Sequence, residues 1–193
     1  MLSDSMLRGI RIGTRDNTDL IARGGAKVRD LTSSIYYDSD RNGARCIKVS
    51  GYKIILLHVG TNDLSNGRTA IEVALDMKEL LDVIRRSNRD AVVVVSAILY
   101  RPVDDVSSFR KVNVITTEVK RVTERFRSVL FIRSHTLFKS GDSLLLQLYD
   151  ARGLHLNRRG LDRFGAYLRA RLSRGCLARD FALARRTVPP SLR

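Results

Sequence analysis

Asn62 is the polar residue whose place in the chain most clearly suggests chemistry. The apolar run 54–57 leads through His58 and Val59 into Gly60-Thr61-Asn62-Asp63, which predicts a buried strand that ends in a sharp turn. In an open α/β sheet, ligands bind at the carboxyl ends of the strands. An Asn side chain there could stabilise a developing oxyanion, because its amide is neutral and donates hydrogen bonds. Asn-Asp after Gly is also common in ordinary turns, so this segment alone leaves both interpretations open.

Two further segments, one near each end of the chain, extend this pattern. Ser5 lies in Ser-Asp-Ser-Met-Leu-Arg (residues 3–8), and His155 lies in Gly-Leu-His-Leu-Asn (residues 153–157), just before an amphipathic segment. Taken in order, Asp-Ser, Gly-Thr-Asn-Asp and Gly-Leu-His-Leu-Asn resemble the motifs of the SGNH (GDSL-type) hydrolase family. Gly25, in residues 24–31, resembles the family's second block, where a Gly ends the second strand. The resemblance covers roughly residues 1–172.

The resemblance implies a serine ester hydrolase. Ser5 would attack an ester carbonyl, and His155 would remove its proton and return that proton to the leaving alcohol. The backbone N–H groups of Ser5 and Gly25 and the side chain of Asn62 would hold the oxyanion. The implied substrate is a small carboxylic or acetyl ester, and no cofactor or metal ion is expected.

The chain departs from the family pattern in two places. Arg152 stands where the family has an Asp three residues before the His, and the nearest carboxylate is Asp150. Asp150 could still orient His155, or a Ser–His dyad could work without it. Only three residues precede Asp4, with Ser3 in place of the usual Gly, so we expect the interior first strand to be truncated. The neighbouring strands would then carry unpaired backbone groups.

Two other histidines and one Gly-Asp-Ser sequence receive a structural interpretation. His58 lies on the predicted central strand, where we expect a hydrogen-bonded neighbour within the sheet. His135 follows the predicted last strand and is expected in a loop. Gly141-Asp142-Ser143 repeats the family's name motif, but it falls in a polar stretch late in the chain and is interpreted as a turn.

Length and composition indicate one compact domain. The chain has 193 residues, 44% of them hydrophobic, which suits one α/β unit with a sizeable core. Cys46 and Cys176 have no metal-like spacing, which argues against a zinc site and suits a reducing compartment. No apolar run reaches the length of a membrane span, and no signal peptide opens the chain. These features predict a cytoplasmic protein, and they leave the oligomeric state open.

The charge is the outlier of the composition. There are 35 Lys and Arg residues against 20 Asp and Glu, a net charge of +15, and arginines crowd the last third. A field of this sign attracts polyanions such as nucleic acid. Within the family, a basic chain with these motifs resembles the esterase domains of some animal retroelements. The alternative to an esterase is therefore a catalytically inactive SGNH-type fold that binds nucleic acid through its basic surface.

Alternating strand and helix patterns predict the fold. They indicate an α/β protein, a three-layer α/β/α sandwich with a parallel sheet. The domain is expected to span residues 1–174, followed by a basic, mobile tail at 175–193. Apolar residues at helical spacing should face the core. In the helix at 68–88 these are Ile71, Leu75, Met77, Leu80, Leu81 and Ile84, and in the helix at 106–127 they are Val112, Ile115, Val119 and Val122. The expected strands are 18–22, 52–59, 90–99 and 129–132, and the expected helices are 25–37, 68–88, 106–127 and 158–172.

Overall fold

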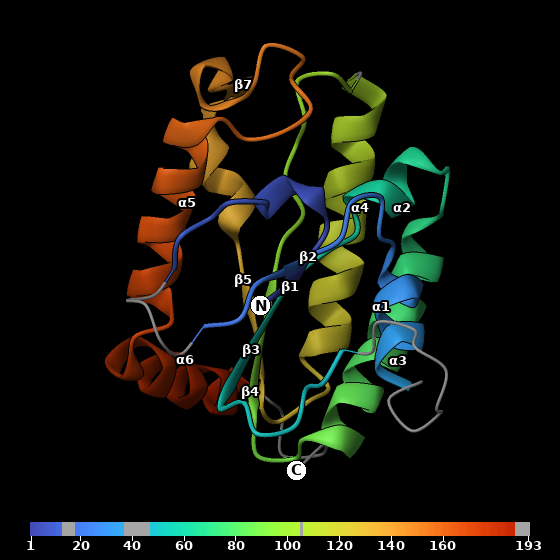
Figure 1. Cartoon of the computed structure of the whole chain (residues 1–193), viewed down its shortest axis with the longest axis vertical. Helices are drawn as coiled ribbons and strands as arrows, with labels where there is room; N and C mark the ends of the chain where they lie inside the picture. Colours follow the sequence, from blue (N-terminus) through green and yellow to red (C-terminus); the bar gives the residue numbers. More distant parts are fainter. Residues whose placement is uncertain (13–17, 37–46, 105, 188–193) are drawn as a thin grey trace.

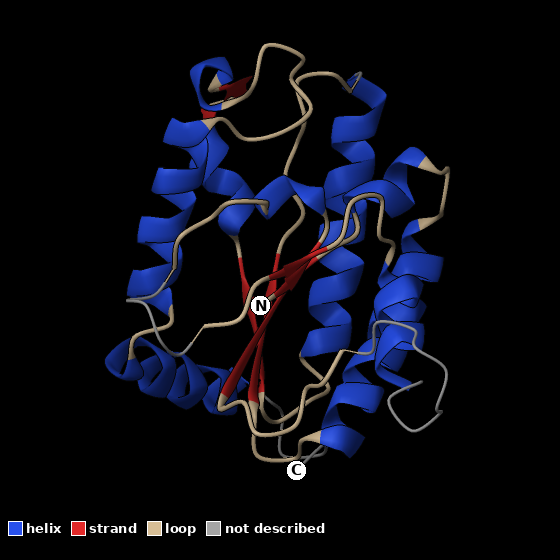
Figure 2. Ribbon diagram, in the orientation of Figure 1, coloured by secondary structure: helices blue, strands red, loops and turns tan. Residues whose placement is uncertain are grey.

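A parallel five-stranded sheet lies at the centre of the protein. The computed structural model describes residues 1–12, 18–36, 47–104 and 106–187. The strands run in the order β2-β1-β3-β4-β5, and every neighbouring pair is parallel (Figures 1 and 2). Their bounds are β1 Leu2–Ser3, β2 Ile21–Ala22, β3 Ile54–His58, β4 Val92–Ser96 and β5 Val129–Ile132. The predicted parallel α/β sheet is thus confirmed.

Helices cover both faces of the sheet, because side chains along a strand alternate between faces. Ile55 and Leu57 of β3 pack with the cluster that includes α1 (Val28–Tyr36), α3 (Ala70–Ser87) and α4 (Val106–Thr123). Leu56 between them packs with the opposite cluster, which includes α5 (Arg158–Arg171). Figure 1 shows α1, α3 and α4 on one side of the sheet and α5 on the other. The fold is therefore a three-layer sandwich.

The first strand is short, but it is present. Leu2 of β1 pairs with Ile21 of β2 on one side and with Leu57 of β3 on the other. Leu2 is buried, so these two residues hold an interior position in the sheet. Among the described residues, β1 reaches only Leu57 and His58 of β3, and it has no partner for the rest of that strand. The expected loss of pairing is therefore confined to the amino-terminal part of β3.

Helix α3 begins with a capping box, and four residues of its predicted inward face, Met77, Leu80, Leu81 and Ile84, are buried as expected. The Thr69 hydroxyl accepts a hydrogen bond from the Glu72 N–H while the Glu72 carboxylate accepts one from the Thr69 N–H, a capping box. The prediction that Ile71 and Leu75 face the core is wrong, because they are 67% and 60% exposed. Both lie about half a turn from the stripe that packs on the sheet, since each residue advances about 100° around a helix. That stripe comprises Val73, Met77, Leu80, Leu81 and Ile84.

The predicted inward residues of α4 are confirmed. Val112, Ile115, Val119 and Val122 are all buried.

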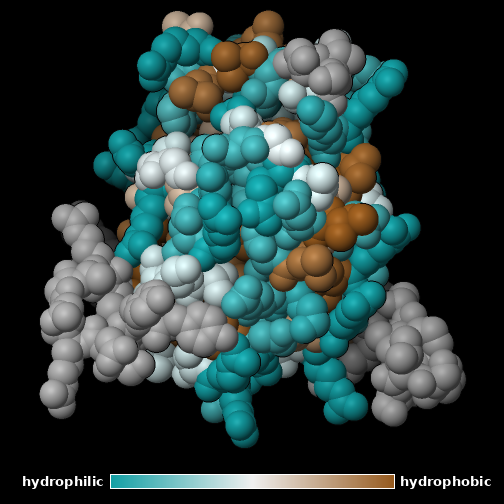
Figure 3. Space-filling view, turned by 90° about the vertical axis from the view of Figure 1, so that its right-hand side faces the viewer, coloured by the Kyte–Doolittle hydropathy of each residue, from teal (hydrophilic) through white to brown (hydrophobic). Residues whose placement is uncertain are grey.

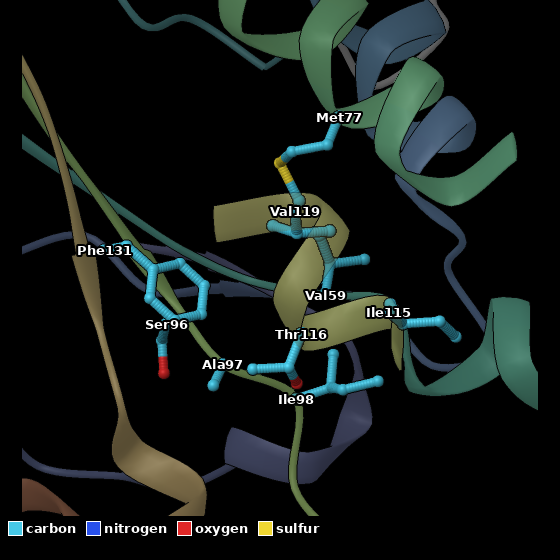
Figure 4. Close-up of a pocket in the computed structure, with 9 residues that line it drawn as sticks. All are labelled: Val59, Met77, Ser96, Ala97, Ile98, Ile115, Thr116, Val119 and Phe131. Carbon is cyan, nitrogen blue, oxygen red and sulfur yellow. The ribbon is translucent and has the colours of Figure 1, made fainter. Parts of the chain in front are cut away.

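Figure 3 shows the face formed by α3 and its neighbours as largely hydrophilic with isolated apolar side chains. A small gap remains inside, between the sheet and helices α3 and α4 (Figure 4). Its lining is mainly apolar and consists of Val59, Met77, Ser96, Ala97, Ile98, Ile115, Thr116, Val119 and Phe131.

A further helix follows α5. Residues Arg174–Thr187 form helix α6, an element that the sequence did not predict. Leu177 is buried against the α5 side of the core, and Asp180 pairs with Arg171 of α5 at 3.0 Å. Residues 188–193 lie outside the described residues. The division at residue 174 into a domain and a separate tail stays a prediction.

The remaining elements are short. They are the 3-10 turns η1 Ser5–Leu7, η3 Ser134–Phe138 and η4 Leu146–Leu148, helix α2 Thr61–Ser65, and the strands β6 Lys139–Ser140 and β7 Ser143–Leu144. Within the described ranges, no helix is both long and apolar enough to cross a membrane.

Candidate active site

Three of the predicted site residues follow three neighbouring strands. Ser5 comes directly after β1, Gly25 after β2 and Asn62 after β3. Strand β1 lies between β2 and β3 in the sheet, and all three are parallel. The carboxyl ends of these strands therefore meet at one edge, which is where ligands bind in sheets of this kind.

Asp4 fixes the turn that carries Ser5. The Asp4 N–H donates to the His58 carbonyl at 3.2 Å, which ties the turn to β3. Its carboxylate Oδ1 accepts a hydrogen bond from the Met6 N–H at 2.9 Å and so caps the 3-10 turn η1. At the other end of this turn, the Arg8 N–H donates to the Ser5 carbonyl at 3.2 Å. The backbone around Ser5 is thus held from both sides, while Ser5 itself is only partly buried.

The Asp4 carboxyl is an unusual neighbour for a reactive serine, because it is fully buried. Burial raises its pKa from 3.8 to about 6, although the Met6 N–H, the Thr61 hydroxyl and the Arg101 charge act in the opposite direction. The Thr61 hydroxyl lies near the carboxyl without meeting hydrogen-bond geometry, and Asp4 Oδ2 has no partner among the described residues. Near neutral pH the structure therefore holds a poorly solvated carboxylate in the residue that precedes Ser5.

A tight glycine turn places Asn62. Gly60 has a φ of 127°, and a Cβ added to it would lie 2.9 Å from the Ile98 side chain, so only glycine fits. The next residues form α2, and the Asn62 Nδ2 donates to the Ala26 carbonyl at 3.0 Å. A side-chain amide has two N–H donors. One of them therefore anchors Asn62 beside Gly25, and the other remains for a further acceptor.

Asp63 also links the turn that carries Asn62 to the segment that follows Gly25. Its Oδ2 accepts a hydrogen bond from the Val28 N–H at 3.1 Å, at the start of α1. Gly25, a few residues earlier, has a φ of 75°, a left-handed conformation that favours glycine. The Gly60–Asp63 turn and the loop that carries Gly25 are thus linked by two side-chain hydrogen bonds.

His155 lies in a loop that is held by hydrogen bonds between its own residues. The Asp150 N–H donates to the His155 carbonyl at 2.8 Å, and the Leu154 N–H donates to Asp150 Oδ1 at 2.9 Å. His155 Nε2 lies 3.1 Å from Ser5 Oγ, within hydrogen-bond distance. The structure thus brings together two residues that are 150 positions apart in the chain.

Asp150 lies on the far side of the imidazole. Its Oδ2 is 3.5 Å from His155 Nδ1, longer than a strong hydrogen bond. Burial acts to raise the pKa of Asp150, but the N–H groups of Leu154 and His155 and the charges of His155 and Arg152 outweigh it, and the pKa is lowered. Arg152 is exposed. The loop therefore places a charged carboxylate near Nδ1 despite the two-residue difference from the family's spacing.

The other polar features that the sequence drew attention to lie elsewhere. His58 is fully buried in the sheet, and its Nδ1 lies 3.1 Å from Ser96 Oγ. His135 lies in η3, and burial lowers its pKa to about 4, helped by the charges of Arg133 and Lys139. Gly141 and Asp142 form the turn between β6 and β7.

Sequence reasoning missed the supporting roles of two carboxylates. Asp4 caps the turn of Ser5, and Asp63 holds the start of α1. An Asp that precedes a turn is a recognisable N-cap, so the Asp4 contact had a local signal. The Asp63 contact joins residues 35 positions apart and had none. Within the described part of the chain, no group of three or more His, Cys, Asp and Glu side chains could hold a metal ion.

Comparisons with known proteins show the family of the chain and its fold. The profile of the GDSL-like lipase/acylhydrolase family matches residues 8–163, a range that includes Gly25, Asn62 and His155 and begins just after Ser5. No curated protein matches the chain.

Several solved structures share the fold. A Streptococcus pneumonia protein provisionally named as a platelet activating factor superposes with a TM-score of 0.74 at 17% identity, over 89% of this chain and 82% of that one. A member of the lipolytic G-D-S-L family from Veillonella parvula gives 0.66 at 18% identity, over 89% and 94%. A carbohydrate esterase of family 3 from Talaromyces cellulolyticus gives 0.61 at 16% identity, over 86% and 72%.

Proposed function

Since the chain belongs to the GDSL-like lipase/acylhydrolase family, we propose that it is a serine ester hydrolase acting on small carboxylic esters, acetyl esters among them. The observation that carries this proposal is the 3.1 Å distance between Ser5 Oγ and His155 Nε2. A serine hydroxyl is a poor nucleophile by itself, and a base at this distance can accept its proton.

In the first half of the reaction, Ser5 Oγ attacks the ester carbonyl carbon while its proton moves to His155 Nε2. Asp150, near Nδ1, favours the tautomer in which Nε2 is the acceptor. The carbonyl oxygen becomes an oxyanion, which accepts hydrogen bonds from the N–H groups of Ser5 and Gly25 and the second N–H of Asn62. The bond from carbon to the alcohol oxygen then breaks, and the alcohol leaves with the proton from His155.

In the second half, water removes the acyl group from Ser5. His155 takes a proton from the water as the water oxygen attacks the acyl carbon, and the same donors hold the second oxyanion. The bond to Ser5 Oγ breaks, Ser5 recovers its proton from His155, and the carboxylic acid leaves.

The test is the turnover of a short-chain chromogenic ester, 4-nitrophenyl acetate, by the wild-type chain and by Ser5→Ala. We expect Ser5→Ala to lower kcat/KM at least about a thousandfold, because the variant lacks the proposed nucleophile. Ser33→Ala, at an exposed position of α1, is the matched control and should keep wild-type turnover. Equal turnover by the wild-type chain and Ser5→Ala would rule the proposal out.

The charge favours a second candidate, a fold of this family that binds nucleic acid without catalysis. The net charge is +15, and Arg159 and Arg163 lie exposed four residues apart on α5. Binding of this kind should depend on phosphates and fall steeply with salt. Fluorescence anisotropy with a labelled single strand over a salt series measures it. Binding with no esterase turnover above that of Ser5→Ala would favour this candidate over the first.

A further inference from the structure

The side chain of Arg8 lies beside the loop that carries Gly25. Its backbone is tied to the turn of Ser5, because the Arg8 N–H donates to the Ser5 carbonyl. From there its guanidinium reaches Gly24, where an added Cβ would lie 3.1 Å from Arg8 Nη2. The missing side chain of Gly24 therefore gives the guanidinium its space. Arg8 spans from the candidate nucleophile to the candidate oxyanion loop.

No carboxylate neutralises this guanidinium within the described residues. Arg8 is exposed and takes part in none of the ion pairs found there. Arg101 shows the contrasting arrangement, because it is buried and bound to Asp104 at 2.6 Å and to Ser65. The structure thus uses one arginine to hold the fold and leaves the donors of the other directed at solvent beside the candidate site.

A second exposed cation, Arg152, lies in the loop that carries His155. Its charge reaches the Asp150 carboxylate and helps to lower the pKa of that group. That carboxylate already accepts the Leu154 N–H and lies beside the imidazole. The candidate site therefore has two exposed cations near it, a setting that raises the local concentration of anions.

We propose that Arg8 is a specificity-determining residue that binds an anionic group, a carboxylate or a phosphate, on the ester substrate. The planar guanidinium donates paired hydrogen bonds, and carboxylate and phosphate oxygens match that geometry. A substrate so anchored would be held with its carbonyl near Ser5 and the Gly25 loop. The inference rests on the proposed esterase function and adds a substrate class to it.

The test compares two matched pairs of esters at constant ionic strength. In the first pair the charge is on the alcohol side: 4-acetoxybenzoate against its methyl ester. In the second it is on the acyl side: the mono-4-nitrophenyl ester of adipic acid against 4-nitrophenyl hexanoate. The quantity measured is the ratio of kcat/KM for the anionic ester to that for its neutral partner, in the wild-type chain and in variants. Dividing the wild-type ratio by the variant ratio cancels the intrinsic reactivity of the esters.

We expect Arg8→Gln to lower this ratio about fivefold to tenfold in at least one pair, since hydrogen bonds to charged groups are strong and an exposed site is partly screened. The pair that responds identifies the side of the ester that carries the anion. Arg8→Lys keeps the charge without the planar fork and should recover part of the ratio. Arg89→Gln is the matched control, because Arg89 is exposed just before β4, at the opposite edge of the sheet.

Each failure has its own meaning. If the wild-type chain hydrolyses the neutral esters and Arg8→Gln leaves both ratios unchanged, the anion site is wrong and the esterase proposal stands. If Arg89→Gln lowers the ratios as much as Arg8→Gln, the effect belongs to the overall charge, and the assignment to Arg8 is wrong. If neither pair is hydrolysed faster than by Ser5→Ala, both proposals fall together.

Discussion

Two Ser–His pairs in this molecule have the same separation and opposite surroundings. Ser5 Oγ lies 3.1 Å from His155 Nε2 at the carboxyl edge of the sheet, and Ser96 Oγ lies 3.1 Å from His58 Nδ1 inside it. His155 and its neighbour Asp150 are each about one-third exposed, whereas His58 is fully buried against the ring of Phe164. The distance between the two atoms therefore does not distinguish the pairs.

The electrostatic surroundings do distinguish them. Burial lowers the pKa of His58 to about 3, so this imidazole stays neutral and cannot hold a proton during a reaction. The hydroxyl of its partner Ser96 also bonds to Ser134, whose Oγ donates to the Ala97 carbonyl. Those contacts join strand β4 to the segment after β5. A serine and a histidine in contact can thus be a structural link, and a proposed catalytic pair also needs access for the substrate and oxyanion donors.

The largest expected difference between the two pairs comes from removing each imidazole. His155→Ala should lower ester turnover at least about a thousandfold with little change in melting temperature, because it removes the proposed base from a partly exposed loop. His58→Ala should instead lower the free energy of unfolding by about 2–4 kcal/mol, since it opens a cavity in the core and removes the hydrogen bond between His58 and Ser96. Ester turnover and denaturant unfolding of both variants measure this, and the reverse outcome would exchange the roles of the pairs.

Removal of the side-chain oxyanion donor should have the next largest effect. Asn62→Ala is expected to lower kcat about a hundredfold to a thousandfold, the usual loss for one such donor. Asn66→Ala, one turn later at an exposed position, is the control and should keep most of the activity. If Asn62→Ala changes only KM, the side chain contacts the bound ester without stabilising the transition state.

Asp150→Asn should lower turnover about tenfold to a hundredfold, less than in a tightly bonded triad, because Asp150 Oδ2 is 3.5 Å from the imidazole. An amide there would favour the wrong imidazole tautomer while still accepting the Leu154 N–H, so folding should be retained. Asp142→Asn, in the exposed β6–β7 turn, provides the comparison. Unchanged turnover in Asp150→Asn would indicate a Ser–His dyad.

Replacement of Asp4 should have the smallest effect on turnover. It should have a clear effect on how the free energy of unfolding depends on pH. The folded-state pKa of about 6 lies above the ordinary value of 3.8, so the folded protein binds this proton more tightly than the unfolded chain. Stability is therefore expected to fall as pH rises from about 4 to about 6, by up to about 3 kcal/mol for a difference of roughly two pKa units. Asp4→Asn keeps an acceptor for the Met6 N–H and should flatten this part of the curve.

The readout for Asp4 is the melting temperature across pH 4–8 in the wild-type chain and the variant. Asp90→Asn, at an exposed position before β4, should leave the slope as it is. Parallel curves for the wild-type chain and Asp4→Asn would mean that Asp4 does not titrate in this range.

Local sequence patterns were enough to predict most of the fold. The β-branched run at residues 92–95 and the apolar run at 54–57 became β4 and β3, because a strand buried on both faces needs such runs. The pattern failed at Ile71 and Leu75, since apolar residues can lie on an exposed helix face at little cost. It failed again at residues 174–187, where contacts such as those of Leu177 and Asp180 with the α5 region accompany a helix whose own sequence lacks a clear period.

The site was predictable only as a set of motifs. Family order pointed to Ser5, Gly25, Asn62 and His155, but their roles stay predictions until turnover is measured. The contacts of Arg8 with Gly24 and of Asp63 with Val28 could not be predicted, because each depends on the order of the strands in the sheet. The closeness of Asp150 to His155 depends on the path of one loop, which the spacing alone left open.

The double link from Asn62 to Ala26 and from Asp63 to Val28 has a consequence for how such sequences evolve. A descendant that had lost its nucleophile would still need the Gly-Thr-Asn-Asp segment to hold two loops together, so selection for folding alone would preserve it. The motif would then persist in relatives that no longer hydrolyse anything. The presence of the Gly-Thr-Asn-Asp motif in a sequence therefore indicates the fold. The residues at positions 5 and 155 are the better guide to whether a given copy is catalytically active.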